Sequence, residues 1–390
     1  MPKNKEIVLF DDVFFTSALS GITKYWQNIL DHMNQSSING ELPFELVMLN
    51  RSDKLKSLSF RQIDFPKWDV RLPAAERKNL ALIAQEIGAK SFVSSYDTFC
   101  PGISNVRIVY DLIPEVFGFS KKDRTWMERA LTLLNADFIV PISNSTKQDL
   151  KKYYPSLGEV ISDIAYPGIS SNTFYRRNTQ EIAELKAKHR IGNYILYVGT
   201  RVGEGGYKNG KLLFDLLSIS KPRDFDVVLV GGEPLSPLEK NVIKKSGHLV
   251  RHLAPADDEL GVILSGADAL IHTSLYEGFG MPVLEALACG TPVISTETSS
   301  LVEASGGLSV FISGGNAEEL YDAITTCRQS EWKEKISREG PVHASKFEWK
   351  NSAEIISKVI EKSLSYDRKN RIEFHNAISA YDDLARLTQK

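Results

Sequence analysis

Strand-like and helix-like segments alternate along almost the whole chain, and this alternation limits the fold more than any other feature. Short apolar runs bounded by turn residues predict strands, and apolar residues repeated every three to four positions predict helices. Strands that alternate with helices form parallel sheets, so the sequence predicts an α/β protein. The segments are strands at 7–10, 44–49, 91–93, 106–110 and 138–142, and helices from Gly21 onward, at 80–87 and at 124–134.

The alternation breaks once, around residues 155–190, where turn residues surround a charged helical segment at 179–189. A second series of strands follows. A chain of 390 residues at about 150 residues per domain also suggests two domains. We expect an N-terminal domain at about 1–170 and a C-terminal one at about 176–365, with a cleft between them. The second series comprises 194–198, 227–230, 248–252, 269–272, 292–295 and 309–312.

Composition excludes several classes of protein. The 47 Lys and Arg against 49 Asp and Glu give a net charge of -2, which argues against a protein that coats nucleic acid. The cysteines Cys100, Cys289 and Cys327 have neither zinc spacing nor a disulfide framework. The apolar run at 7–10 is too short for a signal peptide, and no run reaches the ~18 residues of a membrane span. We expect a cytoplasmic location, with peripheral attachment to the inner face of the membrane left open.

The densest chemical signal is the run EGFGMPVLEALACGTPV at 277–293. Pro282 suits the first turn of a helix, and Gly290 suits its end. A helix start offers N–H groups and a positive partial charge to an anion. Glu277 precedes this helix and Glu285 lies inside it, so each carboxylate can bind a pair of sugar hydroxyls. The plainer alternative is a glycine-rich turn with two solvated glutamates.

This run resembles the Glu-x7-Glu motif of glycosyltransferase family 4, which comprises retaining enzymes with the GT-B fold. Residues 197–201 with Lys208 and Asn209 resemble the family's phosphate-binding loop, and 17–26 resembles its N-terminal glycine loop. The resemblance implies two Rossmann-like parallel-sheet domains with an interdomain cleft, and a C-terminal helix, at about 366–390, that packs back on the first domain.

The resemblance also implies a role for each matching residue. Arg201 and Lys208 would hold the pyrophosphate of the donor and stabilise the charge of the leaving group. Glu277 would bind the transferred sugar, and Glu285 the ribose. The backbone N–H groups of Phe279, Gly280 and Met281 would face the sugar, and the backbone of Leu253 the base. Gly21, Gly278 and Asp111 complete the expected donor-binding set.

Two features depart from the family's pattern. The step of seven residues from Arg201 to Lys208 predicts a longer loop than the family usually has. Tyr110 stands where the family often has His, so a role based on that His is lost. Asp111 would then touch the sugar or the acceptor, or would merely cap the turn after its strand.

Other candidate sites are weaker. His248 and His252 are spaced to share one side of a strand, but no third metal ligand is in view. A nicotinamide fingerprint and a P-loop are both missing from the sequence. We therefore expect no metal and no cofactor, with GDP-mannose or a UDP-hexose as the donor substrate.

Residues 51–79 hold eight Lys or Arg against four acids, with Phe60, Phe65 and Trp68 among them. This composition fits a surface for a lipid-linked acceptor and an anionic membrane. It also fits a solvated loop whose aromatic side chains lie underneath, which is the interpretation we favour.

The sequence thus predicts a metal-independent, retaining hexosyltransferase of polysaccharide biosynthesis. It would move mannose or another hexose from a nucleotide sugar to a glycan or lipid-linked hydroxyl acceptor, without a nucleic-acid partner. The alternatives are a GT-B sugar-nucleotide epimerase and a nucleotide-sugar binding protein without turnover.

Overall fold

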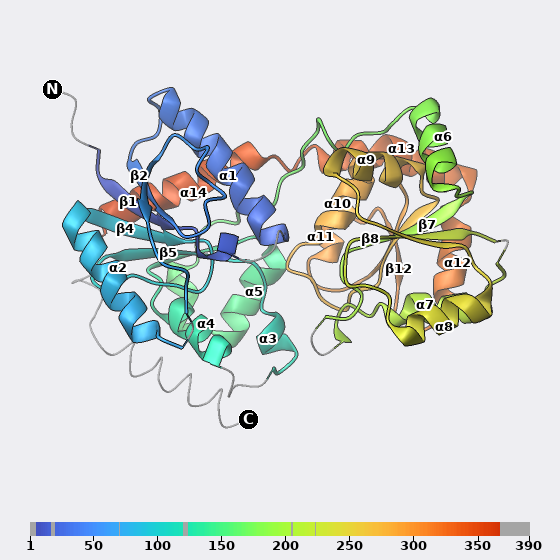
Figure 1. Cartoon of the computed structure of the whole chain (residues 1–390), viewed down its shortest axis with the longest axis horizontal. Helices are drawn as coiled ribbons and strands as arrows, with labels where there is room; N and C mark the ends of the chain where they lie inside the picture. The colour runs from blue at the N-terminus through green and yellow to red at the C-terminus, as the bar shows by residue number, and fades with distance from the viewer. Residues whose placement is uncertain are drawn as a thin grey trace. The chain divides into compact units, whose positions relative to one another are not determined.

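The computed structural model describes residues 5–366, except 17–19, 70, 120–123, 204–205 and 223. These described residues form two compact units, one of the residues up to 168 together with those from 349 onward, and one of residues 169–348 (Figure 1). Each unit is built on a six-stranded parallel sheet with helices on its faces. The predicted α/β class is therefore confirmed.

The first sheet has the strand order β3-β2-β1-β4-β5-β6. Its strands are β1 (Ile7–Asp11), β2 (Glu45–Asn50), β3 (Arg61–Asp64), β4 (Ala89–Ser94), β5 (Ser104–Val109) and β6 (Phe138–Pro141). Its helices are α1 (Gly21–Ile38), α2 (Pro73–Ile87), α3 (Ile113–Val116), α4 (Arg124–Leu134) and α5 (Asn144–Tyr153), with 3-10 turns at Val13–Thr16 and Pro155–Val160.

Both faces of the first sheet are buried, because neighbouring residues of a strand point to opposite faces. Leu9 of β1 joins a cluster with Leu80 of α2. Its neighbour Phe10 meets Trp26 of α1 in an edge-to-face ring contact with centroids 4.9 Å apart. Continuous apolar runs such as 7–10 are the pattern expected of such doubly covered strands.

Helix α14 (Trp349–Leu364) returns to the first unit, where it packs against α1, β4, β5 and β6. Its buried face includes Trp349, whose ring meets that of Tyr25 at 5.6 Å. The chain therefore crosses back at Trp349, earlier than the expected boundary near 365, because this apolar face is buried against α1 and the first sheet. The segment expected to return, 366–390, lies outside the described residues except for Tyr366.

The second sheet has the strand order β12-β11-β10-β7-β8-β9. Its strands are β7 (Tyr194–Val198), β8 (Asp226–Val230), β9 (Val250–Leu253), β10 (Ala269–His272), β11 (Val293–Thr296) and β12 (Ser309–Ile312). Its helices are α6 (Thr179–His189), α7 (Lys211–Ile219), α8 (Pro237–Ser246), α9 (Asp257–Gly266), α10 (Met281–Ala288), α11 (Leu301–Ser305), α12 (Ala317–Cys327) and α13 (Ser330–Ala344).

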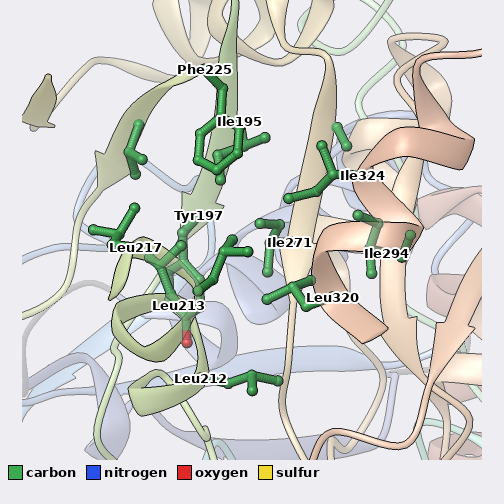
Figure 2. Close-up of a cluster of buried hydrophobic side chains, with 14 of the residues drawn as sticks. Ile195, Tyr197, Leu212, Leu213, Leu217, Phe225, Ile271, Ile294, Leu320 and Ile324 are labelled. Atoms are coloured by element: carbon green, nitrogen blue, oxygen red, sulfur yellow. The ribbon is translucent and has the colours of Figure 1, made fainter. Parts of the chain in front are cut away.

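One hydrophobic core cluster of the second unit lies between this sheet and helices α7 and α12 (Figure 2). Ile195 and Ile271 come from the two central strands, and Leu213 and Leu320 come from the two helices. All four are at most 1% exposed. This packing fixes β7 and β10 side by side, and with them the loops that follow these strands.

Among the described residues, no helix combines the length and the apolar character needed to cross a membrane.

Candidate active site

The order in which strands are added to the second sheet reverses at β7. Strands β8 and β9 follow on one side of it, and β10, β11 and β12 lie on the other. Open parallel sheets bind ligands outside the carboxyl ends of their strands at such a switch point. Here the loop 199–210 follows β7 and the loop 273–280 follows β10. These two loops carry Lys208 and Glu277.

Lys208, Glu277 and His272 form a charged cluster at this edge. Lys208 Nζ lies 2.6 Å from Glu277 Oε1, and His272 Nε2 lies 3.1 Å from the same oxygen. The three side chains are 18%, 12% and 7% exposed, in that order. A carboxylate only accepts hydrogen bonds, so His272 must donate from Nε2. Among the described residues no hydrogen bond reaches Glu277 Oε2, which leaves this oxygen to a ligand hydroxyl.

The two oppositely charged groups hold each other in the ionised form. Burial alone would raise the pKa of Glu277, but the charge of Lys208 and the bond from His272 outweigh it and keep the pKa well below its ordinary value. Burial would likewise lower the pKa of Lys208, and Glu277 reverses this, so the pKa is raised. The site therefore presents a fixed cation beside a fixed carboxylate at neutral pH.

The long loop before Lys208 is held to the sheet at several points. The Tyr207 carbonyl accepts from the Leu275 N–H at 2.8 Å, and the Asn209 carbonyl accepts from Thr273 Oγ1 at 3.0 Å. The Tyr197 hydroxyl donates to the Lys208 carbonyl at 3.4 Å. The seven-residue step from Arg201 thus still delivers Lys208 to Glu277.

The loop after β11 fixes the backbone of Glu277. The Glu277 N–H donates to Ser299 Oγ at 2.9 Å, and its carbonyl accepts from Ser300 Oγ at 2.7 Å. Ser299 has a φ of 47°, a left-handed conformation that is uncommon outside glycine. The loop after β11 thus holds the backbone of Glu277 from both sides of its peptide unit.

Helix α10 begins one residue after Gly280, beside the same cluster. Gly280 has a φ of 98°, and a Cβ there would lie 2.7 Å from Leu301 Cδ2, so only glycine fits. Among the described residues, the N–H groups of Gly280 and Met281 donate to no acceptor. They give the helix start the anion-binding character expected of it.

The side chains of this segment are divided between core and site. Phe279 is 3% exposed and packs on Phe347, with ring centroids 5.4 Å apart, so its side chain belongs to the core. Glu285 is 6% exposed and lies one turn into α10. A carboxylate kept this deep in a short helix is unusual for a residue without a polar role.

Arg201 does not join Lys208 in this structure. Its guanidinium donates from Nε to Glu239 Oε1 at 2.9 Å and from Nη2 to the Glu233 carbonyl at 2.5 Å. The side chain is 1% exposed, and its buried Nη1 has no partner among the described residues. Sequence reasoning treated Arg201 as half of a cationic pair, whereas the structure places it in a buried ion pair with α8.

The remaining predicted donor residues lie in three different places. Leu253 ends β9, where its carbonyl accepts from the Gly231 N–H at 3.1 Å on the same edge as the loop after β7. Gly21 is the first residue of α1 in the other unit, and the preceding 17–19 lie outside the described residues. Asp111 follows β5, accepts from the Ile113 N–H at 3.1 Å and faces Arg129 at 3.5 Å. The turn-capping alternative for Asp111 therefore holds in the structure.

The spaced histidines do not form a metal site. His248 lies before β9 and stacks on Phe225, while His252 Nε2 contacts the Gly231 carbonyl at 2.7 Å. Within the described part of the chain, no cluster of His, Cys, Asp or Glu could hold a metal ion.

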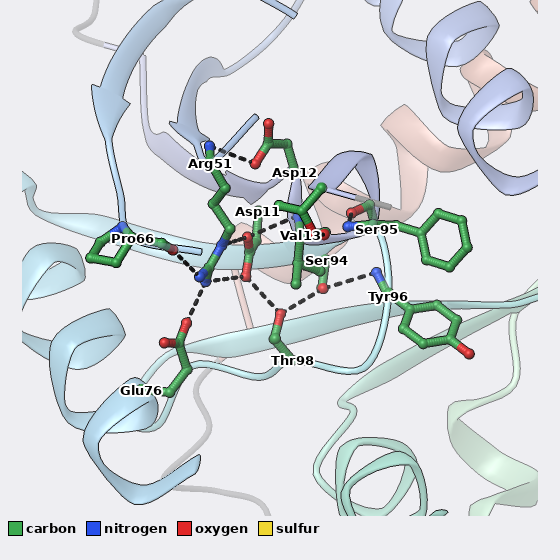
Figure 3. A network of polar contacts seen from close by, with 12 residues as sticks. Asp11, Asp12, Val13, Arg51, Pro66, Glu76, Ser94, Ser95, Tyr96 and Thr98 are labelled. Carbon is green, nitrogen blue, oxygen red and sulfur yellow. Dashed lines mark hydrogen bonds and ion pairs between the residues drawn. The ribbon is translucent and has the colours of Figure 1, made fainter. Parts of the chain in front are cut away.

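In the basic segment, the aromatic side chains largely lie beneath the surface. Phe60 and Phe65 are 7% and 8% exposed, and the Arg51 guanidinium lies 4.5 Å over the Phe65 ring. These two rings are not available to a membrane, which agrees with the solvated-loop interpretation. Arg51 itself is a structural residue at the carboxyl edge of the first sheet (Figure 3).

The carboxyl of Asp12, in the same network, predicts a pH effect on stability. Burial raises its pKa to about 6, although Ser52 and the Arg51 N–H donate to it. The folded state therefore holds this proton more tightly than the unfolded state, and the contribution to stability is lost as pH rises through about 6. As pH rises from 4 to 8, the free energy of unfolding of Asp12→Asn should increase by roughly 1–3 kcal/mol relative to that of the parent. Urea unfolding of both proteins across this range measures the difference, and a gap that stays constant with pH would contradict it.

Sequence reasoning missed His272, Ser299 and Ser300. A histidine at the end of a predicted strand, five residues before Glu277, was a usable signal for His272. The two serines gave none, because their role depends on the folded path of the loop after β11.

Comparison with known proteins finds a family match within the second unit. Residues 180–340 match the family model described as glycosyl transferases group 1. This range contains Lys208, His272, Glu277 and Glu285. The structure of HepE from Anabaena in complex with UDP and glucose superposes with a TM-score of 0.71 at 18% identity, covering 92% of this chain and 100% of that one. The chain therefore has the GT-B fold that the resemblance implied.

Two curated relatives extend the similarity. O-antigen chain mannosyltransferase B of Escherichia coli is 25% identical over 247 residues, which are 60% of this chain and 63% of that protein. D-inositol 3-phosphate glycosyltransferase of Corynebacterium jeikeium is 35% identical over 127 residues, 29% of this chain and 28% of that protein. The chain thus spans less than two thirds of the length of either relative.

Proposed function

We propose that this chain is a retaining glycosyltransferase of the family 4 type, which moves a hexose from a nucleoside diphosphate sugar to a hydroxyl of a glycan or lipid-linked acceptor. The observation that carries the proposal is the Lys208–Glu277 pair at the switch point between β7 and β10. The buried Glu285 eight residues later supports it.

Each group has a distinct task in this reaction. Lys208 stabilises the negative charge that grows on the diphosphate as its bond to the sugar C1 breaks. The start of α10 faces the sugar and the phosphates with its N–H groups, and Glu277 Oε2 accepts from a sugar hydroxyl. The acceptor oxygen then bonds to C1 on the face that the diphosphate leaves, and its proton passes to the departing phosphate oxygen. This front-face route keeps the configuration of C1 and needs no protein nucleophile.

The donor is proposed to be GDP-mannose, with a UDP-hexose as the second candidate. The mannosyltransferase among the relatives supports mannose, and the UDP and glucose bound to HepE support the alternative. A donor that binds only the folded state at about 100 times its dissociation constant should stabilise the protein by roughly 2.7 kcal/mol. Thermal unfolding with GDP, UDP and their hexose derivatives would identify the nucleotide, and no stabilisation by any of them would contradict the proposal.

Glu285→Ala should weaken binding of the free nucleoside diphosphate by roughly 1.5–3 kcal/mol, the range for a hydrogen bond to a charged group. The reason is the proposed pairing of this buried carboxylate with the ribose hydroxyls. Glu285→Gln, which keeps the shape but loses the charge, should fall between the two. Calorimetric titration with the nucleotide measures all three proteins. Equal affinities would show that Glu285 does not bind the ribose.

Transfer should continue in the presence of EDTA, because Lys208 supplies next to the diphosphate the positive charge that a divalent cation supplies elsewhere. Initial rates with and without chelator, and after addition of Mg²⁺ or Mn²⁺, provide the test. Activity that EDTA abolishes and the metal restores would assign this role to a metal.

A further inference from the structure

Glu277 has one partner that the proposed reaction would engage and one that it would not. Lys208 is the proposed cation for the diphosphate, so a bound donor competes with Glu277 for its ammonium group. His272 is the last residue of β10 and pairs with Ser295 of β11 in the parallel ladder. Its side chain is buried and its backbone is held in the sheet, so we do not expect a ligand to displace it.

Both partners bond to Oε1, and this choice of oxygen decides which way the carboxylate turns. With Oε1 held at 3.1 Å by a group anchored in the sheet, Oε2 is the oxygen left for a ligand hydroxyl. The Ser299 and Ser300 bonds fix the backbone of Glu277 but leave its side-chain torsions free. Without His272, only Lys208 would orient the carboxylate, and a bound diphosphate would compete for its ammonium group.

We propose that His272 is a positioning residue, which holds Glu277 Oε1 so that Oε2 keeps facing the transferred sugar after Lys208 has engaged the diphosphate. This inference rests on the proposed function. His272 touches neither substrate nor reacting atom in this role. Its Nε2–H donates in the neutral and in the protonated ring alike, so the role does not require a proton transfer.

Two substitutions separate positioning from acid–base chemistry. His272→Gln keeps an N–H donor on a side chain of similar reach, whereas His272→Leu removes the donor and fills the space. We expect the Leu variant to lose about tenfold or more in kcat and the Gln variant to stay within about threefold of the parent. Free nucleoside diphosphate should bind all three equally, because it lacks the sugar. The intact nucleotide sugar should lose affinity only with the Leu variant.

His248→Leu is the matched control, since His248 is 5% exposed in the same unit but lies at the amino edge of the sheet. It should keep kcat and both affinities. A Leu variant at 272 with unchanged kcat and sugar-dependent affinity would overturn the inference. A Gln variant as impaired as the Leu variant would overturn it in favour of proton transfer by the imidazole. A parent protein that binds no nucleotide sugar would instead contradict the proposed function, on which the inference rests.

Discussion

Lys208→Ala should lower kcat by about 10²-fold or more, the effect seen when one preorganised charge-stabilising group is removed. Lys208 already lies 2.6 Å from Glu277, so it is placed before substrate arrives. Its contribution should be larger in the transition state, where the diphosphate carries more charge, so the donor KM should change much less. Lys208→Arg should not restore full activity, because the planar guanidinium of Arg and the compact ammonium of Lys differ in shape and reach. Steady-state kinetics on the purified variants measure both constants.

Lys211→Ala is the control for this substitution. Lys211 is three residues away, 82% exposed and paired with Asp215, so its replacement should leave kcat unchanged. An unchanged kcat in Lys208→Ala would mean that Lys208 only balances the charge of Glu277. The cation for the diphosphate would then have to be sought elsewhere, with Arg201 as the next candidate.

Arg51→Ala should destabilise the first unit by roughly 3–5 kcal/mol, the cost of leaving a buried charge unpaired. Arg51 and Asp11 are both 0% exposed in their side chains, and Arg51 Nε lies 2.6 Å from Asp11 Oδ1 (Figure 3). The guanidinium also bonds to Glu76 and to the Pro66 carbonyl. Its removal leaves the Asp11 carboxylate without its ionic partner. Denaturant unfolding of parent and variant measures the loss.

Lys56→Ala provides the contrast, because the Lys56–Asp53 pair is more than half exposed on both sides and its loss should leave stability almost unchanged. Asp11→Asn combined with Arg51→Met should recover part of the loss, since no unpaired charge then stays buried. If Arg51→Ala lowers the free energy of unfolding by less than about 1 kcal/mol, water must reach the Asp11 carboxylate, and this contact network is not shielded from solvent.

The strands that the sequence predicted well are those covered by helices on both faces. Burial on both faces makes every position apolar, and such a continuous run can be recognised in the sequence. Strand β3 was missed, since the run from Arg61 to Asp64 is polar and its pairing with β2 alone makes it a strand. Helix α5 was missed for a related reason. Only Thr146 and Leu150 of its ten residues are buried, so it shows no apolar stripe.

The sequence indicated the location of candidate residues that directly follow a strand or begin a helix. Lys208, Glu277 and the glycine before α10 are of this kind. The partner of Arg201 was not predictable, because Glu239 is 38 residues away on a helix whose position depends on the packing of α7 and α8. His272 could have been found from its place at the end of a predicted strand, but its contact with Glu277 Oε1 is known only from the structure.

The most direct test of the central claim is to identify the product formed from nucleotide sugars and a hydroxyl acceptor. Purified protein would be incubated with labelled GDP-mannose and UDP-hexoses and a crude glycan or lipid acceptor, and proton NMR would give the anomeric configuration of the product as it first forms. The account predicts release of a nucleoside diphosphate and a transferred hexose with the configuration of the donor. An inverted product, an epimerised sugar nucleotide, or binding without any product would contradict it.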